Sequence, residues 1–162
     1  MTTYINPAPG STSQISLKLE LASASGFTSA LAVPALQDIT VNAANDVFTW
    51  TQLDSSAKLQ VATTSTNSIA MNLVLDDASF FGTTLNAVQT DAVATQGILG
   101  LSRNKTKIKF SLKFLENGTS DRYLQGVGYI TGLAPKISAD QPVWVSPITI
   151  TVSGEYTVTA TE

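Results

Sequence analysis

The chain has 162 residues, enough for one domain with a core of its own. Charged residues make up only 13% of it, against about 25% in an average soluble domain. Cysteine and histidine are both absent, which excludes disulfides, thiolate nucleophiles and zinc–thiolate sites and removes the most common proton shuttle near neutral pH. A weakly charged surface rich in Ser, Thr, Asn and Gln suits a subunit that packs against other subunits.

The N-terminal residues MTTYINPAPG contain neither a basic nor an apolar segment. We therefore expect no secretory signal and a protein made in a cytoplasm. The longest apolar stretch, residues 30–36, is interrupted by Pro34 and is too short to span a bilayer. Membrane insertion by this chain is not expected.

The charges are unevenly distributed along the chain. Residues 20–102 hold seven acids and one base, whereas residues 103–122 hold six bases and two acids. Three interpretations of the basic run stay open. It binds nucleic acid, it is the solvated face of a strand, or it complements the acidic surface of a neighbouring subunit.

Residues 15–21, ISLKLEL, alternate apolar and polar side chains. This period of two predicts a strand with one face in the core. A long loop is expected at 22–36. Two short strands, 38–43 and 47–53, are then expected on either side of turn residues 42–46.

Asp54 lies in the segment LDSSAK, which has the composition of a turn. Strands are predicted over 58–64 and 68–75. The residues between them, 63–67, form either a turn or the bend of one continuous long strand.

A helical pattern follows the acidic pair Asp76–Asp77. The apolar residues that recur at helical spacing are Phe81, Leu85, Val88 and Ala92. They predict one helix within 83–96, in one piece or two. Either aspartate can cap its start, because a carboxylate accepts hydrogen bonds from the unpaired N–H groups of a first helical turn.

Residues 106–115 give the clearest strand, with apolar residues alternating with lysines. Asn117-Gly118 predicts a tight hairpin turn, and the return strand is expected at 120–131. Pro147 argues for an edge or a bulge in the strand that contains it. The last expected elements are a loop at 135–142 and strands at 143–152 and 155–160.

This order predicts a mainly β fold, an antiparallel β-sandwich or barrel with one packed α-helix. The whole of 1–162 is expected to be a single domain, with its core at about 13–155 and an arm at each end. The glycine motifs that bind phosphates are absent. Neighbouring Asp76 and Asp77 would point to opposite faces of a strand. We therefore predict no catalytic, metal or cofactor site.

Three stretches taken together carry a resemblance to a known family. They are TSTNSIAMNLVLDD at 64–77, KIKFSLKFLENGT at 107–119 with its return strand RYLQGVGYITGL at 122–133, and PVWVSPITITVSGE at 142–155. In the order and spacing of these stretches, the chain resembles the tail tube, or major tail, proteins of long-tailed bacteriophages.

The resemblance implies a structural subunit of the virion, without cofactors. Six copies would close a ring in which the inner sheets join into one β-barrel, with the helix outside. Rings would stack head to tail, helped by a loop or hairpin, and would meet other tail proteins at the tube ends. The lumen would pass double-stranded DNA during ejection without specific binding. The same fold serves the tubes of type VI secretion and other contractile injection systems.

The lysines of the basic run are expected to point away from the lumen, because a DNA conduit must not bind its cargo. They would face a neighbouring subunit or solvent. The residues predicted at subunit interfaces are Asp54, Lys58, Lys105, Lys107, Lys109, Lys113, Arg122 and Trp144.

Other functions compete with this interpretation. A β-sandwich that binds carbohydrate or decorates a capsid or cell surface would also carry many Ser and Thr residues. A pilus-like subunit is disfavoured because the first residues carry no export signal. An enzyme that uses carboxylates alone remains an alternative, which loss of a hydrolase activity on a single Asp substitution would reveal.

Overall fold

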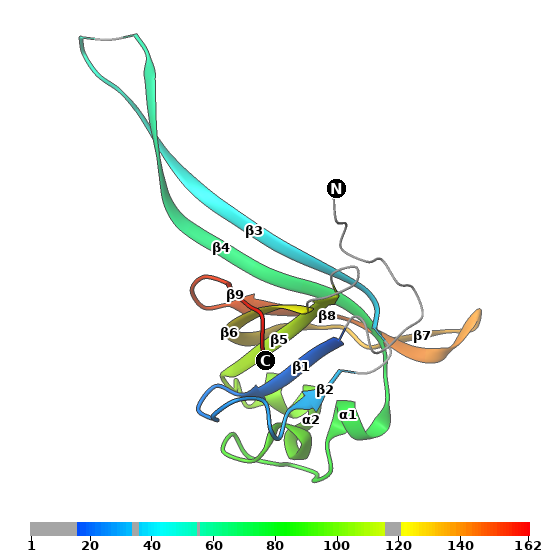
Figure 1. The fold of residues 1–162 in the computed structure, drawn as a ribbon. Coiled ribbons are helices and arrows are strands. Elements are labelled where there is room, and N and C mark those ends of the chain that lie inside the picture. Colours follow the sequence, from blue (N-terminus) through cyan, green and yellow to red (C-terminus); the bar gives the residue numbers. More distant parts are fainter. Residues whose placement is uncertain (1–15, 34–35, 55, 116–120) are drawn as a thin grey trace.

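The structure, a computed structural model, describes residues 16–33, 36–54, 56–115 and 121–162. Within these ranges the chain forms nine strands and two helices (Figure 1). The strands are β1 (Ser16–Leu21), β2 (Leu31–Ala32), β3 (Leu36–Thr51), β4 (Lys58–Val74), β5 (Ile108–Leu115), β6 (Asp121–Leu133), β7 (Lys136–Ser138), β8 (Gln141–Val152) and β9 (Thr157–Thr159). The helices are α1 (Asp77–Phe81) and α2 (Val93–Arg103).

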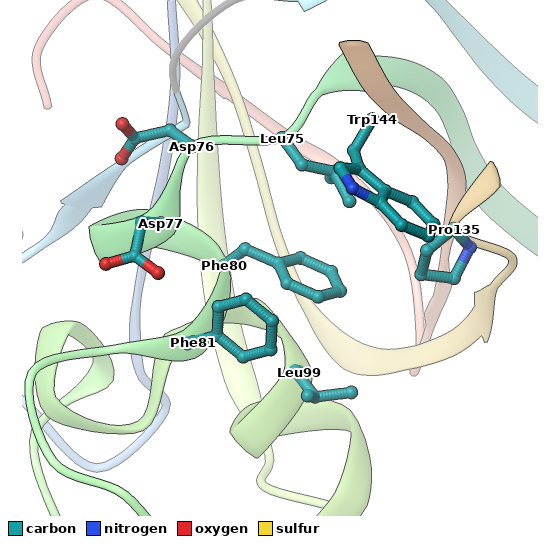
Figure 2. A pocket seen from close by; sticks show the side chains of 8 residues that line it. All are labelled: Leu75, Asp76, Asp77, Phe80, Phe81, Leu99, Pro135 and Trp144. Carbon is teal, nitrogen blue, oxygen red and sulfur yellow. The ribbon is translucent and has the colours of Figure 1, made fainter. Parts of the chain in front are cut away.

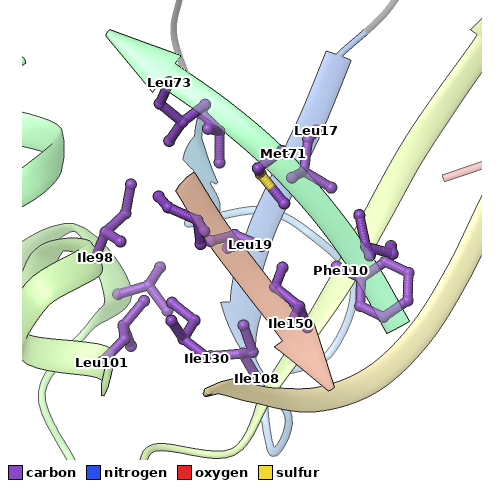
Figure 3. Close-up of a cluster of buried hydrophobic side chains, with 14 of the residues drawn as sticks. Leu17, Leu19, Met71, Leu73, Ile98, Leu101, Ile108, Phe110, Ile130 and Ile150 are labelled. Carbon is purple, nitrogen blue, oxygen red and sulfur yellow. The ribbon is translucent and has the colours of Figure 1, made fainter. Parts of the chain in front are cut away.

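All nine strands belong to one antiparallel sheet. Seven of them follow the order β2-β1-β5-β6-β8-β4-β3, while β7 pairs with β8 and β9 pairs with β6. The sheet folds over on itself, because side chains of β1 and β5 share one core with side chains of β4 and β8 (Figure 3). The predicted mainly β, sandwich-like fold is confirmed.

Two glycines of β6 let the sheet fold tightly. A Cβ on Gly126 would lie 2.7 Å from the ring of Phe110, and one on Gly128 would lie 2.3 Å from the carbonyl oxygen of Thr151. No side chain fits at either position. The backbone of β6 therefore approaches both neighbouring strands more closely than any other residue type would allow.

The core fills the space between the two halves of the folded sheet and α2. Its largest fully buried side chains include Leu17, Leu19, Ile69, Leu73, Ile98, Leu101, Ile108, Phe110, Leu112 and Ile150. Burying each one stabilises the fold by about 1.5–3 kcal/mol. The alternation predicted for the strands at 15–21 and 68–75 places Leu17, Leu19, Ile69 and Leu73 in this core.

The first correction concerns β3, which is one strand of 16 residues and not two strands around a turn. The predicted turn residues 42–46 continue the pairing with β4, and the register shifts between Asn45 and Val47. The cluster of Asn and Asp therefore marks an irregularity in the ladder, a β-bulge, rather than a reversal of the chain. The turn that contains Asp54 is confirmed, since it joins β3 to β4.

On the second strand of this hairpin, one of the two predicted alternatives is right. β4 runs without interruption for 17 residues, so 63–67 is not a turn.

The helix predicted within 83–96 is wrong in position. The chain instead forms two helices, and only the first residues of α2 fall in that range. Asp76 caps α1, with its Oδ2 accepting from the N–H of Ser79 at 3.1 Å, so the predicted capping role is confirmed. Gly82 then ends α1 at φ 77°. Three residues of the predicted stripe are exposed and cover no core: Phe81, Leu85 and Val88.

Most predicted strands in the remainder of the chain are confirmed with small shifts of their ends. The short strands β2 and β7 lie in segments predicted as loops. Neither alternative predicted for Pro147 holds for β8 as a whole: the strand is not at an edge, because it lies between β6 and β4, and its pairing with β4 shows no bulge at Pro147. Pro147 occurs where β8 exchanges one partner, β6, for another, β7. The turn predicted at Asn117-Gly118 lies outside the described residues.

The two helices meet through a pair of glycines. Gly82 and Gly97 both have positive φ, 77° and 65°, and Gly97 kinks α2. A Cβ on Gly97 would lie 2.3 Å from the backbone nitrogen of Gly82 and 2.6 Å from the carbonyl oxygen of Phe80. Neither helix can move away without uncovering the core beneath Ile98.

Replacing Gly97 by Ala is expected to lower the free energy of unfolding by about 3 kcal/mol, because it adds backbone strain and a backbone clash together. Gly26→Ala is the matched control, since Gly26 has φ 67° but no atom within 4 Å of the new Cβ. It should cost only about 1 kcal/mol. Urea unfolding of both variants measures the difference, and equal losses would show that the helix contact is unimportant.

Candidate assembly interface

The hairpin of β3 and β4 extends far beyond the core (Figure 1). Along β4, burial alternates from Asn67 to Leu73, whereas every residue from Lys58 to Thr66 is exposed. The change occurs where β8 ends, since Asn67 pairs with Val152, the last residue of β8. We call residues 43–66 the arm. Because the arm has no layer packed against it in the subunit, its two faces are open to contacts with other molecules.

One face of the arm is apolar. Phe48 lies opposite Val61, and Trp50 lies opposite Leu59. The rings of Phe48 and Trp50 stack with their centroids 5.8 Å apart. We call the four residues Phe48, Trp50, Leu59 and Val61 the apolar arm face; all are exposed. Leu53, in the turn that follows, is fully exposed. A contiguous apolar patch of this kind marks an interaction surface.

An apolar pocket of about 460 Å³ lies at the other end of β4 (Figure 2). Helices α1 and α2, the end of β4, the β6–β7 connection and β8 form its walls. We call it the apolar pocket; its lining residues are Leu75, Asp76, Asp77, Phe80, Phe81, Leu99, Pro135 and Trp144. Three of its apolar side chains, Phe81, Leu99 and Trp144, are exposed at its opening.

The face of β6, β8, β4 and β3 that points away from the core is polar and almost uncharged. We call it the polar face; its residues are Asp38, Thr40, Asn42, Ser68, Asn72, Thr131, Thr149 and Thr151, together with Ala70, Tyr129 and Pro147. The hydroxyls of Thr131 and Thr151 are 2.7 Å apart. Its one charged residue, Asp38, accepts from the amide of Asn72 at 2.8 and 3.0 Å. No Lys or Arg occurs among these residues.

The residues predicted at interfaces lie in three separate places. Asp54 and Lys58 are at the end of the arm, and Trp144 is in the apolar pocket. The remaining five, from Lys105 to Arg122, lie on or beside β5 and the start of β6. The fold does not bring the eight residues together, and their interface role stays a prediction.

The basic run lies in the opposite layer of the sandwich from the polar face. β5 is paired on both sides, with β1 and β6, so its lysines do not guard an open edge. The ammonium group of Lys109 donates to the carbonyl oxygen of Ala24 and lies 5.0 Å over the ring of Phe27. Lys113 is 2.9 Å from Asp121, and this hydrogen bond raises the pKa of Lys113. These two lysines are engaged within the chain, whereas Lys105 and Lys107 are exposed.

The sequence analysis missed the apolar arm face. Trp50 has the residue type of a core or interface anchor, and Phe48 was predicted only as one residue of the strand expected at 47–53. A signal was present: apolar residues alternate in VFTW at 47–50 and again in LQV at 59–61, on both sides of one turn. Paired alternation around a turn predicts that the apolar residues share a face of a hairpin.

Other kinds of site find no support in the described part of the chain. It contains no group of three or more acidic residues placed to hold a metal ion. Nor does any helix in these ranges have the length and apolar character needed to cross a membrane.

Tyr156 fastens the C-terminal segment to the base of the arm. Its hydroxyl is 2.8 Å from the carbonyl oxygen of Asn42 on β3 and 2.9 Å from that of Ser68 on β4. Its ring lies edge-on to Phe110, with centroids 6.3 Å apart. Burial raises the pKa of Tyr156. The side chain therefore links the arm, the core and the segment after β8.

The fold described above matches that of a phage tail tube protein. No protein-family model and no curated protein matches the sequence. Solved structures do match it over nearly its full length. The SPP1 tail tube protein aligns with a TM-score of 0.65 at 13% identity, covering 94% of this chain and 80% of that one.

Two further structures match similarly. A chain from the tail of an empty gene transfer agent (GTA) particle aligns with a TM-score of 0.61 at 15% identity, over 89% of this chain and 96% of that one. A chain from the anti-feeding prophage (AFP) baseplate aligns with a TM-score of 0.63 at 9% identity, over 96% and 98%. At these identities the likeness establishes the fold.

Tyr156→Phe is expected to lower the free energy of unfolding by about 1 kcal/mol, because two carbonyl oxygens lose their donor. Since the folded pKa of Tyr156 is raised, its contribution is complete below the ordinary tyrosine pKa of about 10 and is lost as pH rises through the folded value. Denaturant unfolding at pH 7 and above pH 10 should show the gap between wild type and variant closing. Tyr129→Phe, at an exposed position, is the control and should change nothing.

Proposed function

We propose that this chain is the subunit of a phage tail tube. Six copies close a ring, rings stack head to tail, and double-stranded DNA passes through the lumen during genome ejection. The observation that carries the proposal is the open edge of β3, at which another chain can pair. Two of the similar structures are described as a tail tube and as a tail with C6 symmetry, which supports the ring number.

The layer formed by β6, β8, β4 and β3 has two open edges. At one side, β3 pairs only with β4 among the described strands. At the other side, β5 leaves β6 after Gly128, so residues 129–133 of β6 pair with β8 alone. A strand edge of 16 residues is a template for another chain. In the ring, β3 of one copy pairs with residues 129–133 of the next, and closure removes both edges.

The polar face then lines the lumen. Joining the edges makes this layer the continuous wall of a barrel, whose core-facing side is covered by β1, β5 and α2. The other side carries hydroxyls and amides with a single carboxylate per subunit, Asp38. A wall without cations offers the phosphates of DNA no attractive charge, so the DNA passes through the lumen without binding. The lysines of β5 lie in the other layer, away from the lumen.

The proposal places the protein in the virion, after synthesis in the host cytoplasm. Its partners are its own copies, together with other tail proteins at the two ends of the tube. Its role is structural and not enzymatic, because contacts between subunits account for the surfaces described above. The subunit inserts into no membrane and needs no cofactor.

A second candidate is the tube of a contractile injection system. The likeness to a chain of the AFP baseplate favours it, because that match is as extensive as the others. Such a tube has the same ring and stacking, and it differs by the sheath around it. A carbohydrate-binding module is less well supported. The apolar pocket offers sugars few hydrogen bonds, and its Asp76 already caps α1.

Purified full-length protein is expected to assemble into hollow tubes of uniform width at high concentration. Six-fold end views of single rings should accompany the tubes. Negative-stain electron microscopy followed by helical reconstruction checks both features. Protein that stays monomeric at every concentration, or forms only irregular aggregates, would contradict the tube proposal.

The absence of cysteine allows the lumen to be located directly. Thr151→Cys, on the polar face, should bring a small mercury label to the channel of the assembled tube. Lys107→Cys should bring the same label to the outside or to a subunit boundary. Difference maps from electron microscopy of the two labelled tubes measure this. Mercury from Thr151→Cys on the outer surface would refute the assignment of the polar face.

A further inference from the structure

The apolar arm face is exposed in the subunit, although residues of this kind are normally covered. Phe48 is 58% exposed and Val61 is 48% exposed. The two aromatic rings of this face are already stacked on one another, so little side-chain freedom remains to be lost on binding. Rigid aromatic anchors of this type dominate the energetics of protein interfaces.

The apolar pocket is the complementary feature. Its volume of about 460 Å³ is large enough to receive several large side chains. Trp144, Pro135 and Leu99 line it together with Phe80 and Phe81, whose rings meet edge-on (Figure 2). Nothing among the described residues fills it.

The patch and the pocket cannot meet within one molecule. They lie at the two ends of β4, with the apolar arm face at Leu59 and Val61 and the pocket beginning at Leu75. A strand rises about 3.3 Å per residue, so the two ends are about 50 Å apart. Because β4 is continuous and paired along its whole length, it does not fold back on itself. The occupant of the pocket must come from another molecule.

We propose that the apolar arm face of one copy docks into the apolar pocket of the next copy along the tube. The proposal rests on the proposed tube function, and it names the residues that hold one ring to the next. A patch and a distant complementary pocket on the same subunit make a heterologous contact, which repeats without closing and produces a filament. Each ring then presents one set of arms and one set of pockets.

Charged groups stand beside both surfaces. Lys58 precedes Leu59 at the start of β4 and leaves the strand on the face opposite Leu59, beside the turn that holds Asp54. Asp76 and Asp77 line one side of the pocket (Figure 2), and Asp77 is exposed. Because Asp76 already caps α1, Asp77 is the carboxylate that the flexible ammonium group of Lys58 reaches when the arm docks. A single pair of this kind fixes the orientation of the arm more than it adds affinity.

Engineered cysteines test the contact, since the chain has none of its own. The variant Leu53→Cys/Leu99→Cys has one thiol at the end of the arm and one in the pocket, both at exposed positions, and keeps the apolar arm face intact. Oxidation of assembled protein should give a ladder of disulfide-linked multimers on a non-reducing gel, because each chain links to the next. The control Leu53→Cys/Val158→Cys, with its second thiol on exposed β9, should give no ladder.

Each other outcome overturns the docking proposal. Dimers without longer multimers would indicate a reciprocal exchange of arms between two copies. Tubes that form normally but give no ladder would refute the docking while leaving the tube function intact. Absence of the ladder, together with absence of tubes from the wild-type protein, would overturn the two proposals together.

A second set of variants tests the contact without cysteines. Phe48→Ser/Trp50→Ser should raise the concentration needed for tube growth at least tenfold and leave single rings and the thermal unfolding of the subunit unchanged. Val158→Ser removes an exposed apolar side chain elsewhere and should have no effect. Tubes that grow at the wild-type concentration from the double variant would refute the docking.

Discussion

The uninterrupted pairing of β3 with β4 is the constraint on which the other features depend. Over its inner half β4 has two neighbours, β3 and β8, and one face of it lies in the core. Beyond Asn67 only β3 remains. Main-chain hydrogen bonds hold the two strands together there, but no hydrophobic burial supports them. A two-stranded hairpin alone is only marginally stable in water, so the docking proposed above would add to the stability of the arm.

The bend of the sheet at β6 has a second consequence, because it gives the subunit two outer faces of different chemistry. Side chains of β1 and β5 meet those of β4 and β8 in the core, so the outward sides of these strand pairs point in opposite directions. The lysines of β5 belong to one outer side, and the hydroxyls and amides of the polar face belong to the other. A single continuous sheet thus separates cations from a neutral wall without a second domain.

The sequence predicted the elements that depend on burial in the subunit itself. Strict alternation located β1, the inner half of β4 and β5, because one side of each is in the core. Alternation failed to predict the structure where backbone geometry, or contacts outside the subunit, decide the conformation. Residues 81–92 have helical spacing, yet the positive φ of Gly82 and its contact with Gly97 end α1 at once. Asn45 and Asp46 have the composition of a turn and instead continue β3 opposite a bulge in β4, where Thr63 and Thr64 both lie across from Asp46.

The same limit explains why the candidate interface was predicted only in part. Trp144, Asp54 and Lys58 were identified as interface residues, and they lie at or beside the pocket and the arm end. The apolar arm face was not, because its residues have no buried partner in the chain. Both strands carry apolar alternation there, but the register that joins Phe48 to Val61 depends on the bulge before Val47. Without that one-residue shift, the apolar residues of the two strands would lie on opposite faces.

The bulge also helps a subunit with a long open strand edge to avoid pairing with other chains before assembly. Asp46 lies at the shift and accepts hydrogen bonds from the hydroxyls of Thr63 and Thr64, which fixes the irregularity. A bulge interrupts the regular ladder that a passing strand would need, and it increases the local twist. Below the bulge, β3 keeps one register against β4 from Asp38 to Asn45, and this is the part of its edge that we propose for pairing around the ring. Above the bulge lies the apolar arm face, which we propose for docking along the tube. The two proposed contacts then use separate parts of one strand.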